Sequence, residues 1–407
     1  MIATEQVAEN QPAIKRHHFL ELLDRHLEGR LTFLLDGSPV HVGRGRPGLT
    51  GSDATLQVHD RRFFGRVLAA GNLGLGEAYM ARDFEMVEGT LEDFLILLLR
   101  SRLDEKITAD PLSALRILGT RVYDILRGKQ QNIKRHYDIG DDLFELFLDS
   151  SLTYSCGYAH APTDDVETLQ RNKLERICQK LRLAPGERLL DIGCGYGGLL
   201  THAAKHHGVT GVGVTISRHH CDRGNANIAA AGLADRIEIR FQDHTTLDGT
   251  FDKVVSVGMM EHVPRREYRR YFTNIARMLT PKGYGLVHTI GCNGAVNHHD
   301  PFIQKYIFPG SNQPRLSEIT ENLEKCRLAI VDVENMVRHY AVTGRRWLEA
   351  FRARADQLDK TKYDETFRRM WEYYLACGVA GMTASDTALY QVVFTKDYAA
   401  DLSLQRV

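Results

Sequence analysis

The sequence lacks two features that would direct it to a membrane or to nucleic acid. It has no apolar run approaching the ~20 residues that a membrane-spanning helix needs. It also has no net charge, because lysine plus arginine and aspartate plus glutamate both number 52. No global electrostatic field therefore draws the chain to lipid or nucleic acid, so any such attraction must be local. We expect no nucleic-acid partner.

Cysteine is scarce and scattered. The seven residues form no CxxC pair, which favours reduced thiols in the cytoplasm and argues against a zinc site or a disulfide framework. We therefore expect no metal. The first residues, MIATEQVAENQPAIKRHHF, are polar and include acids, so we expect no signal peptide.

The chain also lacks internal repeats and low-complexity segments, and 407 residues favour two domains. Residues 1–100 mix β-like stretches such as LTFLLDG and ATLQVHD with a helical pattern at 61–70, which predicts a small α+β domain. Residues 101–130 are typical of a helical linker. From 131 to 407 strand-like and helix-like patterns alternate, which predicts an α/β domain with a doubly wound, mostly parallel sheet.

A glycine-rich turn follows the first strand of this second domain. The sequence DIGCGYGG places Asp191 two residues before Gly193 and four before Gly195. Glycines at the carboxyl edge of a sheet let the backbone approach a ligand closely. A dinucleotide-binding turn would have GxGxxG spacing, which fits imperfectly here. The acid before the first glycine suits a cofactor without a pyrophosphate, so the pattern predicts an S-adenosylmethionine-dependent methyltransferase.

A second cofactor contact is expected where the run RIEIRF ends in Gln242, Asp243 and His244. This edge of such a sheet meets the adenine, with Asp243 accepting a hydrogen bond from the exocyclic amine. The alternative is that Asp243 is an ordinary turn residue after a strand.

Several longer strings resemble the cyclopropane-fatty-acyl-phospholipid synthases and their mycolic-acid relatives. They run in the order HYDIG, YSCGY, LLDIGCGYGG, GVGVTIS, VVSVGMMEHV, LVHTIG, DPFIQKYIFPG, MWEYYLACG and LYQVVF, and LGLGEAYM resembles the small N-terminal domain of the longer synthases. The likeness covers nearly the whole chain. It implies a seven-stranded, Rossmann-like methyltransferase domain with lipid-binding insertions.

The resemblance also implies an activity, namely methylene transfer from S-adenosylmethionine to the double bond of an unsaturated acyl chain in a phospholipid. The cation formed on the alkene needs a dry pocket and then loses a proton. The family holds bicarbonate as the base. The matching positions are the backbone N–H groups of Cys156 and Ile290 and the side chains of Glu261, His288 and Tyr340.

A carboxylate beside an anion is unfavourable, so we expect Glu261 to share a proton with the ion or with His288. Ordinary structural explanations stay open for these residues. The Cys156 thiol could be a buried apolar group, and His288 a structural histidine. Glu261 could begin a helix, and Tyr340 could be a core aromatic residue.

The cofactor positions that the resemblance implies are Tyr154, Ser155, Gly193, Gly195, Thr215 and Ile216. The chain departs from the family at three places. His220 stands where glutamine commonly meets the ribose, Tyr196 where tryptophan follows GCG, and Tyr390 where LYQVVF usually has tryptophan.

Segment 115–136 has apolar residues at helical spacing and six basic residues against one acid. It could lie on anionic lipid, or it could be a linker helix packed on the catalytic domain. By resemblance we expect a homodimer, associated peripherally with the cytoplasmic face of the inner membrane. The rival functions are a fatty-acid methyltransferase giving a branched-methyl or methylated unsaturated chain, a non-catalytic lipid- or cofactor-binding protein, and a methyltransferase for small molecules or nucleic acid.

Overall fold

The computed structural model describes residues 2–44, 53–103, 106, 139–294 and 300–399. They form two compact units. The first comprises Met1–Gly140, Asp300–Pro309 and Phe351–Ser385, and the second comprises Asp141–His299, Gly310–Ala350 and Asp386–Val407. The division expected at residues 100 and 130 stays a prediction, because most of the expected linker, and most of segment 115–136, lies outside the described residues.

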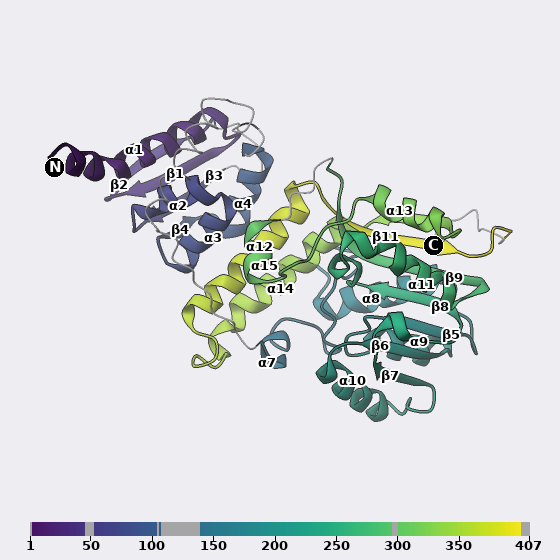
Figure 1. The fold of residues 1–407 in the computed structure, drawn as a ribbon. Coiled ribbons are helices and arrows are strands. Elements are labelled where there is room, and N and C mark those ends of the chain that lie inside the picture. The colour runs from purple at the N-terminus through teal and green to yellow at the C-terminus, as the bar shows by residue number, and fades with distance from the viewer. Residues whose placement is uncertain (1, 45–52, 104–105, 107–138, 295–299, 400–407) are drawn as a thin grey trace. The chain divides into compact units, whose positions relative to one another are not determined.

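The first unit is built on a four-stranded sheet in the order β2-β1-β3-β4. Strands β1 and β3 are parallel, and the other two pairs are antiparallel. Its elements (Figure 1) are α1 (Ile2–His26), β1 (Arg30–Leu35), β2 (Ser38–Val42), β3 (Asp53–Val58), α2 (Arg62–Ala70), α3 (Asn72–Met80), β4 (Phe84–Glu88), α4 (Leu91–Arg100), α12 (Pro301–Tyr306), η4 (Ala355–Gln357) and α15 (Glu365–Ala384).

Phenylalanine rings form the core of this unit. Phe63 lies 5.7 Å from Phe19 and 5.2 Å from Phe84 between ring centroids, in edge-on geometry. Phe33 and Phe64, both fully buried, complete the cluster. Aromatic pairs in this geometry contribute more than their buried area alone. The sheet, α1 and α2 are therefore held by one aromatic cluster.

Two helices from late in the sequence complete the first unit. Helices α12 and α15 pack on α3, and α15 also packs on α4. The approach is close enough that a Cβ atom on Gly76 would lie 2.4 Å from the Phe302 ring and 2.7 Å from the Tyr373 ring. Glycine at position 76 is therefore required by packing.

The second unit contains a seven-stranded sheet in the order β10-β11-β9-β8-β5-β6-β7. Only β11 runs antiparallel to its neighbours. The elements are α7 (Asp141–Phe144), α8 (Val166–Lys180), β5 (Arg188–Ile192), α9 (Gly198–His207), β6 (Thr210–Thr215), α10 (Arg218–Ala230), β7 (Ile237–Phe241), η1 (His244–Thr246), β8 (Phe251–Val257), η2 (Met260–His262), η3 (Arg265–Glu267), α11 (Tyr268–Met278), β9 (Leu279–Cys292), α13 (Leu316–Lys325), β10 (Ala329–Asn335), α14 (Val337–Arg354, whose last turn belongs to the first unit) and β11 (Thr387–Thr395).

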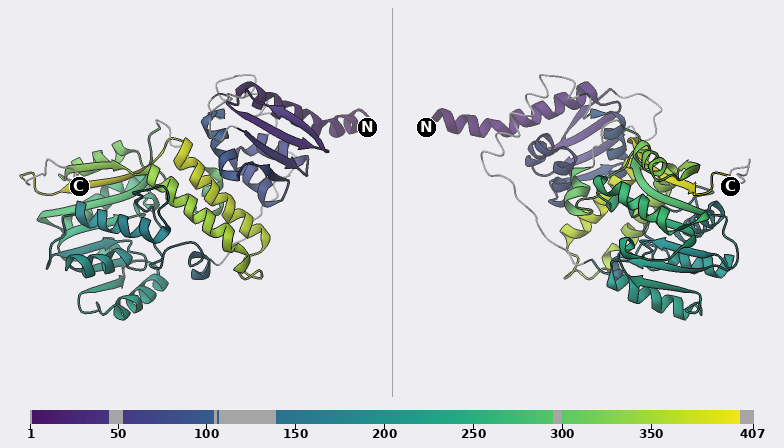
Figure 2. Two further views of the ribbon diagram at one scale, coloured as in Figure 1. Left: turned by 180° about the vertical axis from the view of Figure 1, so that it is seen from behind. Right: turned by 45° about the vertical axis from the view of Figure 1, so that its right-hand side comes forward.

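Helices cover both faces of this sheet (Figure 2). Residues of α8, α9 and α10 share one apolar cluster with the sheet, and residues of α11 and α13 share another. Tyr390, buried in the second cluster, donates its hydroxyl proton to the carbonyl of Cys292. The predicted doubly wound α/β fold with a small N-terminal α+β domain is confirmed. Among the described residues, no helix is both long and apolar enough to cross a bilayer.

Candidate active site

The glycine turn lies at the carboxyl end of β5, an inner strand between β8 and β6. Gly193, Gly195 and Gly197 have φ values of 78°, 55° and 80°, which residues with a side chain rarely adopt. The N–H groups of Gly193 and Cys194 donate to the carbonyl of Val214 at 2.9 and 3.2 Å, which ties the turn to the end of β6. Helix α9 then begins at Gly198.

Asp191, directly before this turn, is buried beside a lysine that the sequence reading missed. Burial raises the pKa of Asp191 to about 7, and the charge of Lys173 opposes the rise. Lys173 is 2% exposed, and burial lowers its pKa to about 8. Its Nζ donates to Ser155 Oγ at 3.2 Å. Lys173 thus links Asp191 electrostatically to the loop that carries Tyr154 and Ser155.

That loop is held by a buried carboxylate and by aromatic packing. Asp149 accepts hydrogen bonds from the backbone N–H of Thr153 at 2.8 Å and of Ser151 at 3.0 Å. The ring of Tyr154 lies 5.1 Å from Phe144 and 5.3 Å from Trp347 between centroids. The loop that presents Ser155 and Cys156 is therefore fixed on both sides.

The second strand ends at Thr215, whose Oγ1 accepts from the N–H of Ser217 at 3.1 Å. Ile216, next along the chain, is 79% exposed, an unusual state for a large apolar side chain at a sheet edge. His220 is in the first turn of α10, and its ring lies 4.5 Å from the ring of Tyr196. Two of the three departures from the family pattern therefore pack against each other.

The third group of predicted cofactor residues, Gln242 to His244 after β7, lies beside the end of β6. The N–H of Gln242 donates to the carbonyl of Thr215 at 3.0 Å. Asp243 accepts from the N–H of Thr245 at 2.8 Å and so caps η1. Burial lowers the pKa of the neighbouring His244. Asp243 thus has the turn role that the sequence left open, and its contact with adenine stays a prediction.

The five residues expected to form the base site come from four different parts of the second unit. Cys156 precedes α8, Glu261 lies in η2 after β8, His288 and Ile290 lie on β9, and Tyr340 lies on α14. Cys156, Ile290 and Tyr340 meet in one small apolar cluster with Met336 and Leu389.

Glu261 contacts two consecutive residues of β9, Thr289 and Ile290, and Ile290 belongs to this cluster. Its Oε2 accepts from the Thr289 hydroxyl at 2.8 Å, and its Oε1 lies 3.5 Å from the N–H of Ile290. The residue is 8% exposed. Burial raises its pKa to about 7, so the carboxyl is about half protonated at neutral pH.

His288 is held in one tautomer by two residues that the sequence reading also missed. Lys180 Nζ donates to Gln391 Oε1 at 2.7 Å, which turns the Gln391 amide nitrogen toward His288 Nδ1 at 3.1 Å. Because an amide nitrogen only donates, Nδ1 must accept, and the ring proton lies on Nε2. Burial lowers the pKa of His288 to about 3, so the ring is neutral.

The Nε2 atom of His288 is buried and makes no hydrogen bond to any residue that the structure describes. A buried donor without a partner is costly and therefore indicates a missing acceptor. The sequence carried a signal for this network, namely the glutamine inside the apolar run LYQVVF. Lys180 could not be paired with it from sequence, because the two residues are 211 positions apart.

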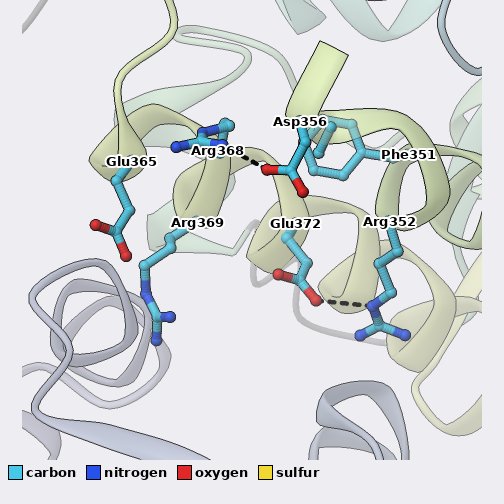
Figure 3. A pocket seen from close by; sticks show the side chains of 8 residues that line it. Phe351, Arg352, Asp356, Glu365, Arg368, Arg369 and Glu372 are labelled. Atoms are coloured by element: carbon cyan, nitrogen blue, oxygen red, sulfur yellow. Dashed lines mark hydrogen bonds and ion pairs between the residues drawn. The ribbon is translucent and has the colours of Figure 1, made fainter. Parts of the chain in front are cut away.

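One surface pocket lies elsewhere, in the first unit (Figure 3). It is lined by Phe351, Arg352, Ala355, Asp356, Glu365, Arg368, Arg369 and Glu372. Its guanidinium groups already pair with carboxylates, as Arg352 does with Glu372 at 2.7 Å and Arg368 with Asp356 at 3.0 Å. None of the predicted site residues lines it, so we do not place the chemistry there.

A glycine turn after an inner parallel strand of a seven-stranded sheet with one antiparallel strand defines a class, the S-adenosylmethionine-dependent methyltransferases. The model of the mycolic acid cyclopropane synthetase family matches residues 126–392. The chain belongs to that family.

Individual relatives agree with this assignment. The chain is 39% identical to the cyclopropane-fatty-acyl-phospholipid synthase of Escherichia coli K12, over 87% of this chain and 91% of the relative. It is 34% identical to the tuberculostearic acid methyltransferase UfaA1 of Mycobacterium tuberculosis, over 80% and 79%. The crystal structure of the mycolic acid cyclopropane synthase CmaA1 with SAH and CTAB superposes with a TM-score of 0.59 and 27% identity, over 64% of this chain and 95% of that one.

Proposed function

We propose that this enzyme transfers a methylene group from S-adenosylmethionine to the double bond of an unsaturated acyl chain in a phospholipid, giving a cyclopropane fatty acid. The observation that carries the proposal is the buried Nε2–H of His288, which lacks an acceptor among the described residues. His288 lies two residues before Ile290 on β9. The N–H of Ile290 faces the Glu261 carboxyl, and its side chain packs in the apolar cluster with Cys156.

S-adenosylmethionine, when bound, supplies the electrophilic methyl group. The residues that would hold it are Tyr154 and Ser155 on the entry loop, Asp191, Gly193 and Gly195 at the turn, Thr215, Ile216 and His220 after β6, and Gln242, Asp243 and His244 after β7. Hydrogen bonds tie the ends of β5, β6 and β7 to one another, which supports a single binding edge. Exposed Ile216 offers an apolar surface for a flat purine ring.

Bicarbonate, when bound, supplies the base. The neutral His288 would donate to it from Nε2, and the backbone N–H groups of Cys156 and Ile290 and the hydroxyl of Tyr340 are further donors in the family's arrangement. Glu261 bears a proton near neutral pH, so it meets an anion as a donor rather than as a second negative charge. Since His288 is neutral, the shared proton belongs to Glu261.

The apolar cluster has a chemical purpose in this proposal. An alkene is a weak nucleophile, and the cation that its methylation produces reacts with any water present. Cys156, Met336 and Leu389 are each 1% exposed or less, so they exclude water from the neighbourhood of Ile290. A dry corner with one base gives proton loss and ring closure in place of hydration.

A second product stays possible on the same scaffold. The relative from Mycobacterium tuberculosis is a tuberculostearic acid methyltransferase by name. The alternative function is therefore a fatty-acid methyltransferase that leaves a branched-methyl or methylated unsaturated chain. Loss of a proton from the cation gives either the ring or the methylated alkene, whereas a saturated branched-methyl chain also requires a hydride from a separate reductant.

The test is incubation of the purified chain with S-adenosylmethionine and vesicles of a monounsaturated phospholipid. Mass analysis should show acyl chains heavier by one CH2. Resistance of that product to ozonolysis indicates a ring, and cleavage indicates a methylated alkene. No product from lipid, with methylation of an added RNA or catechol instead, would contradict the substrate class.

Glu261→Gln tests the base site in the same assay. We expect kcat to fall at least about 100-fold, as for loss of a proton-transfer group, with little change in the KM for S-adenosylmethionine. Glu267→Gln is the control, because this glutamate of η3 has a side chain that is 41% exposed and has no place in the proposed base site. Wild-type turnover in Glu261→Gln would show that the base site lies elsewhere.

We further propose peripheral association with the cytoplasmic face of the inner membrane, and a homodimer. Support for the first comes from the basic residues of segment 115–136. Replacing Arg127, Lys129, Lys134 and Arg135 together with glutamine should reduce co-sedimentation with anionic vesicles, while circular dichroism stays unchanged. Equal sedimentation of variant and wild type would count against this segment. Analytical ultracentrifugation tests the dimer.

A further inference from the structure

Two neighbouring helices of the second unit bring together side chains that can bind a metal. None of these side chains belongs to the proposed base site. Helix α8 carries Glu175 and Cys178, three positions apart and so on one face. Helix α9 carries His202 and His207, and it packs against α8. Donor atoms of Cys178, His202 and His207 all lie within 4.8 Å of one another.

A carboxylate lies between the two imidazoles. Oε2 of Glu175 is 3.1 Å from Nε2 of His202 and 3.1 Å from Nε2 of His207. The second oxygen, Oε1, accepts from the Gln179 side-chain amide at 3.0 Å, which orients the carboxylate. Metal sites commonly have such a hydrogen-bonded outer partner.

The cluster is closed toward the core and open toward solvent. Cys178 is fully buried, while the side chains of His202, His207 and Glu175 are 12%, 19% and 38% exposed. A cation could therefore enter from the Glu175 side and meet sulfur at the inner end. Nothing in the cluster belongs to the glycine turn, which lies at the opposite end of α9 from His207.

We propose that Glu175, Cys178, His202 and His207 form a binding site for a zinc-like transition-metal ion. One thiolate, two imidazoles and one carboxylate are the ligand types and number of a closed tetrahedral zinc site. Calcium and magnesium take oxygen ligands almost exclusively, so this set selects against them. The sequence argued against zinc because no CxxC pair is present, but the packing of two helices supplies the ligands instead.

The geometry requires only a small contraction. Zinc–nitrogen and zinc–sulfur bonds of about 2.0–2.3 Å place tetrahedral ligand atoms roughly 3.3–3.8 Å apart. The donor atoms of Cys178, His202 and His207 lie within 4.8 Å of one another, and Glu175 Oε2 lies 3.1 Å from Nε2 of both histidines. Side-chain movements of about 1 Å would bring the sulfur and nitrogen atoms to tetrahedral spacing. His207 is the last residue of α9 and can adjust. The bound ion would cross-link α8 to α9.

The competing explanation contains no metal. Glu175 would accept hydrogen bonds from both histidines, and Cys178 would be a small apolar residue of the core. The two explanations differ in one measurable property, namely stoichiometric metal binding that depends on the sulfur and on both rings.

The experiment uses the full chain without an affinity tag, freed of metal by a chelator and then titrated with Zn2+ against a chromophoric competitor. We expect each wild-type chain to bind one Zn2+ ion tightly. His207→Gln and His202→Gln should weaken this binding by at least about tenfold, since even outer-shell changes cost 10–100-fold. His206→Gln, which alters the adjacent histidine outside the cluster, should bind like wild type.

Co2+ provides the second measurement. Wild type should show a thiolate-to-cobalt absorption band that Cys178→Ser abolishes. Zn2+ should raise the Tm of wild type and of His206→Gln but not of His207→Gln. Because His207 is at the helix end, its variant should fold even if Cys178→Ser does not. The absence of a tight equivalent in wild type, or its retention in His207→Gln, would overturn the proposal.

Discussion

At the residue scale, the proposed base site around His288 depends on buried polar groups that fix which atoms carry protons. Lys180 is 6% exposed, and it reaches Gln391 and also Glu334, whose Oε2 is 2.6 Å away. Because the ammonium donates to Gln391 Oε1, the Gln391 amide has one orientation and His288 has one tautomer. The hydrogen bond from Lys180 thus determines, through Gln391, which nitrogen of His288 carries the proton.

Gln391→Glu tests this constraint while keeping the side-chain shape. The carboxylate can only accept, so it would favour the tautomer in which His288 Nδ1–H donates a hydrogen bond to it. Nε2 would then be an acceptor and could no longer donate to an anion. We expect kcat to fall about 10- to 100-fold, with the KM for S-adenosylmethionine little changed. Steady-state kinetics and the histidine nitrogen shifts by NMR would measure both effects.

Thr395→Val is the control for a buried change on the same strand. Its hydroxyl bonds to the carbonyl of Gly283 at 2.9 Å, so the variant should lose stability but keep its kcat. A Gln391→Glu enzyme with wild-type kcat would refute a positioning role for Gln391.

The buried Glu261 carboxyl predicts a dependence of stability on pH. Its pKa is about 7 in the folded chain against an ordinary value of 4.5, so the folded state holds the proton more tightly. This contribution to stability is complete below about pH 4.5 and is lost as pH rises through about 7. The shift corresponds to on the order of 3 kcal/mol.

Glu261→Gln cannot ionise, so it should remove this dependence. Between pH 6 and pH 8, the free energy of unfolding by urea should fall for wild type relative to the variant. Glu267→Gln should follow wild type. If the free energy of unfolding had the same pH dependence in wild type and in Glu261→Gln, the pKa of Glu261 would not be raised in the folded chain.

At the element scale, the glycine turn after β5 shapes the proposed cofactor-binding edge of the sheet through its backbone conformation. A Cβ atom on Gly195 would meet nothing within 4 Å, so the positive φ alone requires glycine there. Gly193 differs, because its Cβ would also lie 3.0 Å from Met259 Cγ. The turn thus leaves open space on one side, where the proposed cofactor would bind.

Gly195→Ala should therefore separate cofactor binding from stability. The positive φ costs roughly 1–2 kcal/mol of stability, and the new methyl group should weaken binding of S-adenosylmethionine, measured by calorimetry. Gly186→Ala is closely matched, since Gly186 has a φ of 85° and nothing within 4 Å of its Cβ, but it lies before β5. Equal weakening of binding in both variants would contradict a specific role for Gly195.

At the scale of the whole molecule, the first unit is assembled from three separate stretches of chain. Arg352, at the end of α14, connects two of these stretches, Met1–Gly140 and Phe351–Ser385. It donates to both oxygens of Glu92 on α4, at 3.0 and 2.9 Å, and to Glu372 on α15 at 2.7 Å. Glu92 is only 8% exposed, so its charge depends on this partner.

Arg352→Met should destabilise the first unit by about 2 kcal/mol, because it leaves a nearly buried carboxylate without a cation. Thermal unfolding would measure this loss. Arg61→Met breaks an ion pair with Asp36 whose side chains are 66% and 69% exposed, and it should cost less than about 1 kcal/mol. Equal losses would show that the Arg352 pairs are as weak as surface pairs.

The sequence alone determined the fold class and the position of the glycine turn, because both depend on local patterns. Alternating strands and helices predict a parallel sheet, and glycines at 193 and 195 indicate a backbone that only glycine adopts readily. The five base-site residues came from family resemblance, and the structure brings Cys156, Ile290 and Tyr340 into one cluster.

Only the tertiary structure decided the rest. Lys173 beside Asp191, the link from Lys180 through Gln391 to His288, and the cluster of Cys178 with His202 and His207 join residues on different elements. Their pKa shifts and hydrogen bonds arise from burial and from neighbours that packing supplies. No local pattern encodes such a neighbour, because contacts between helices and strands form only when the chain has folded.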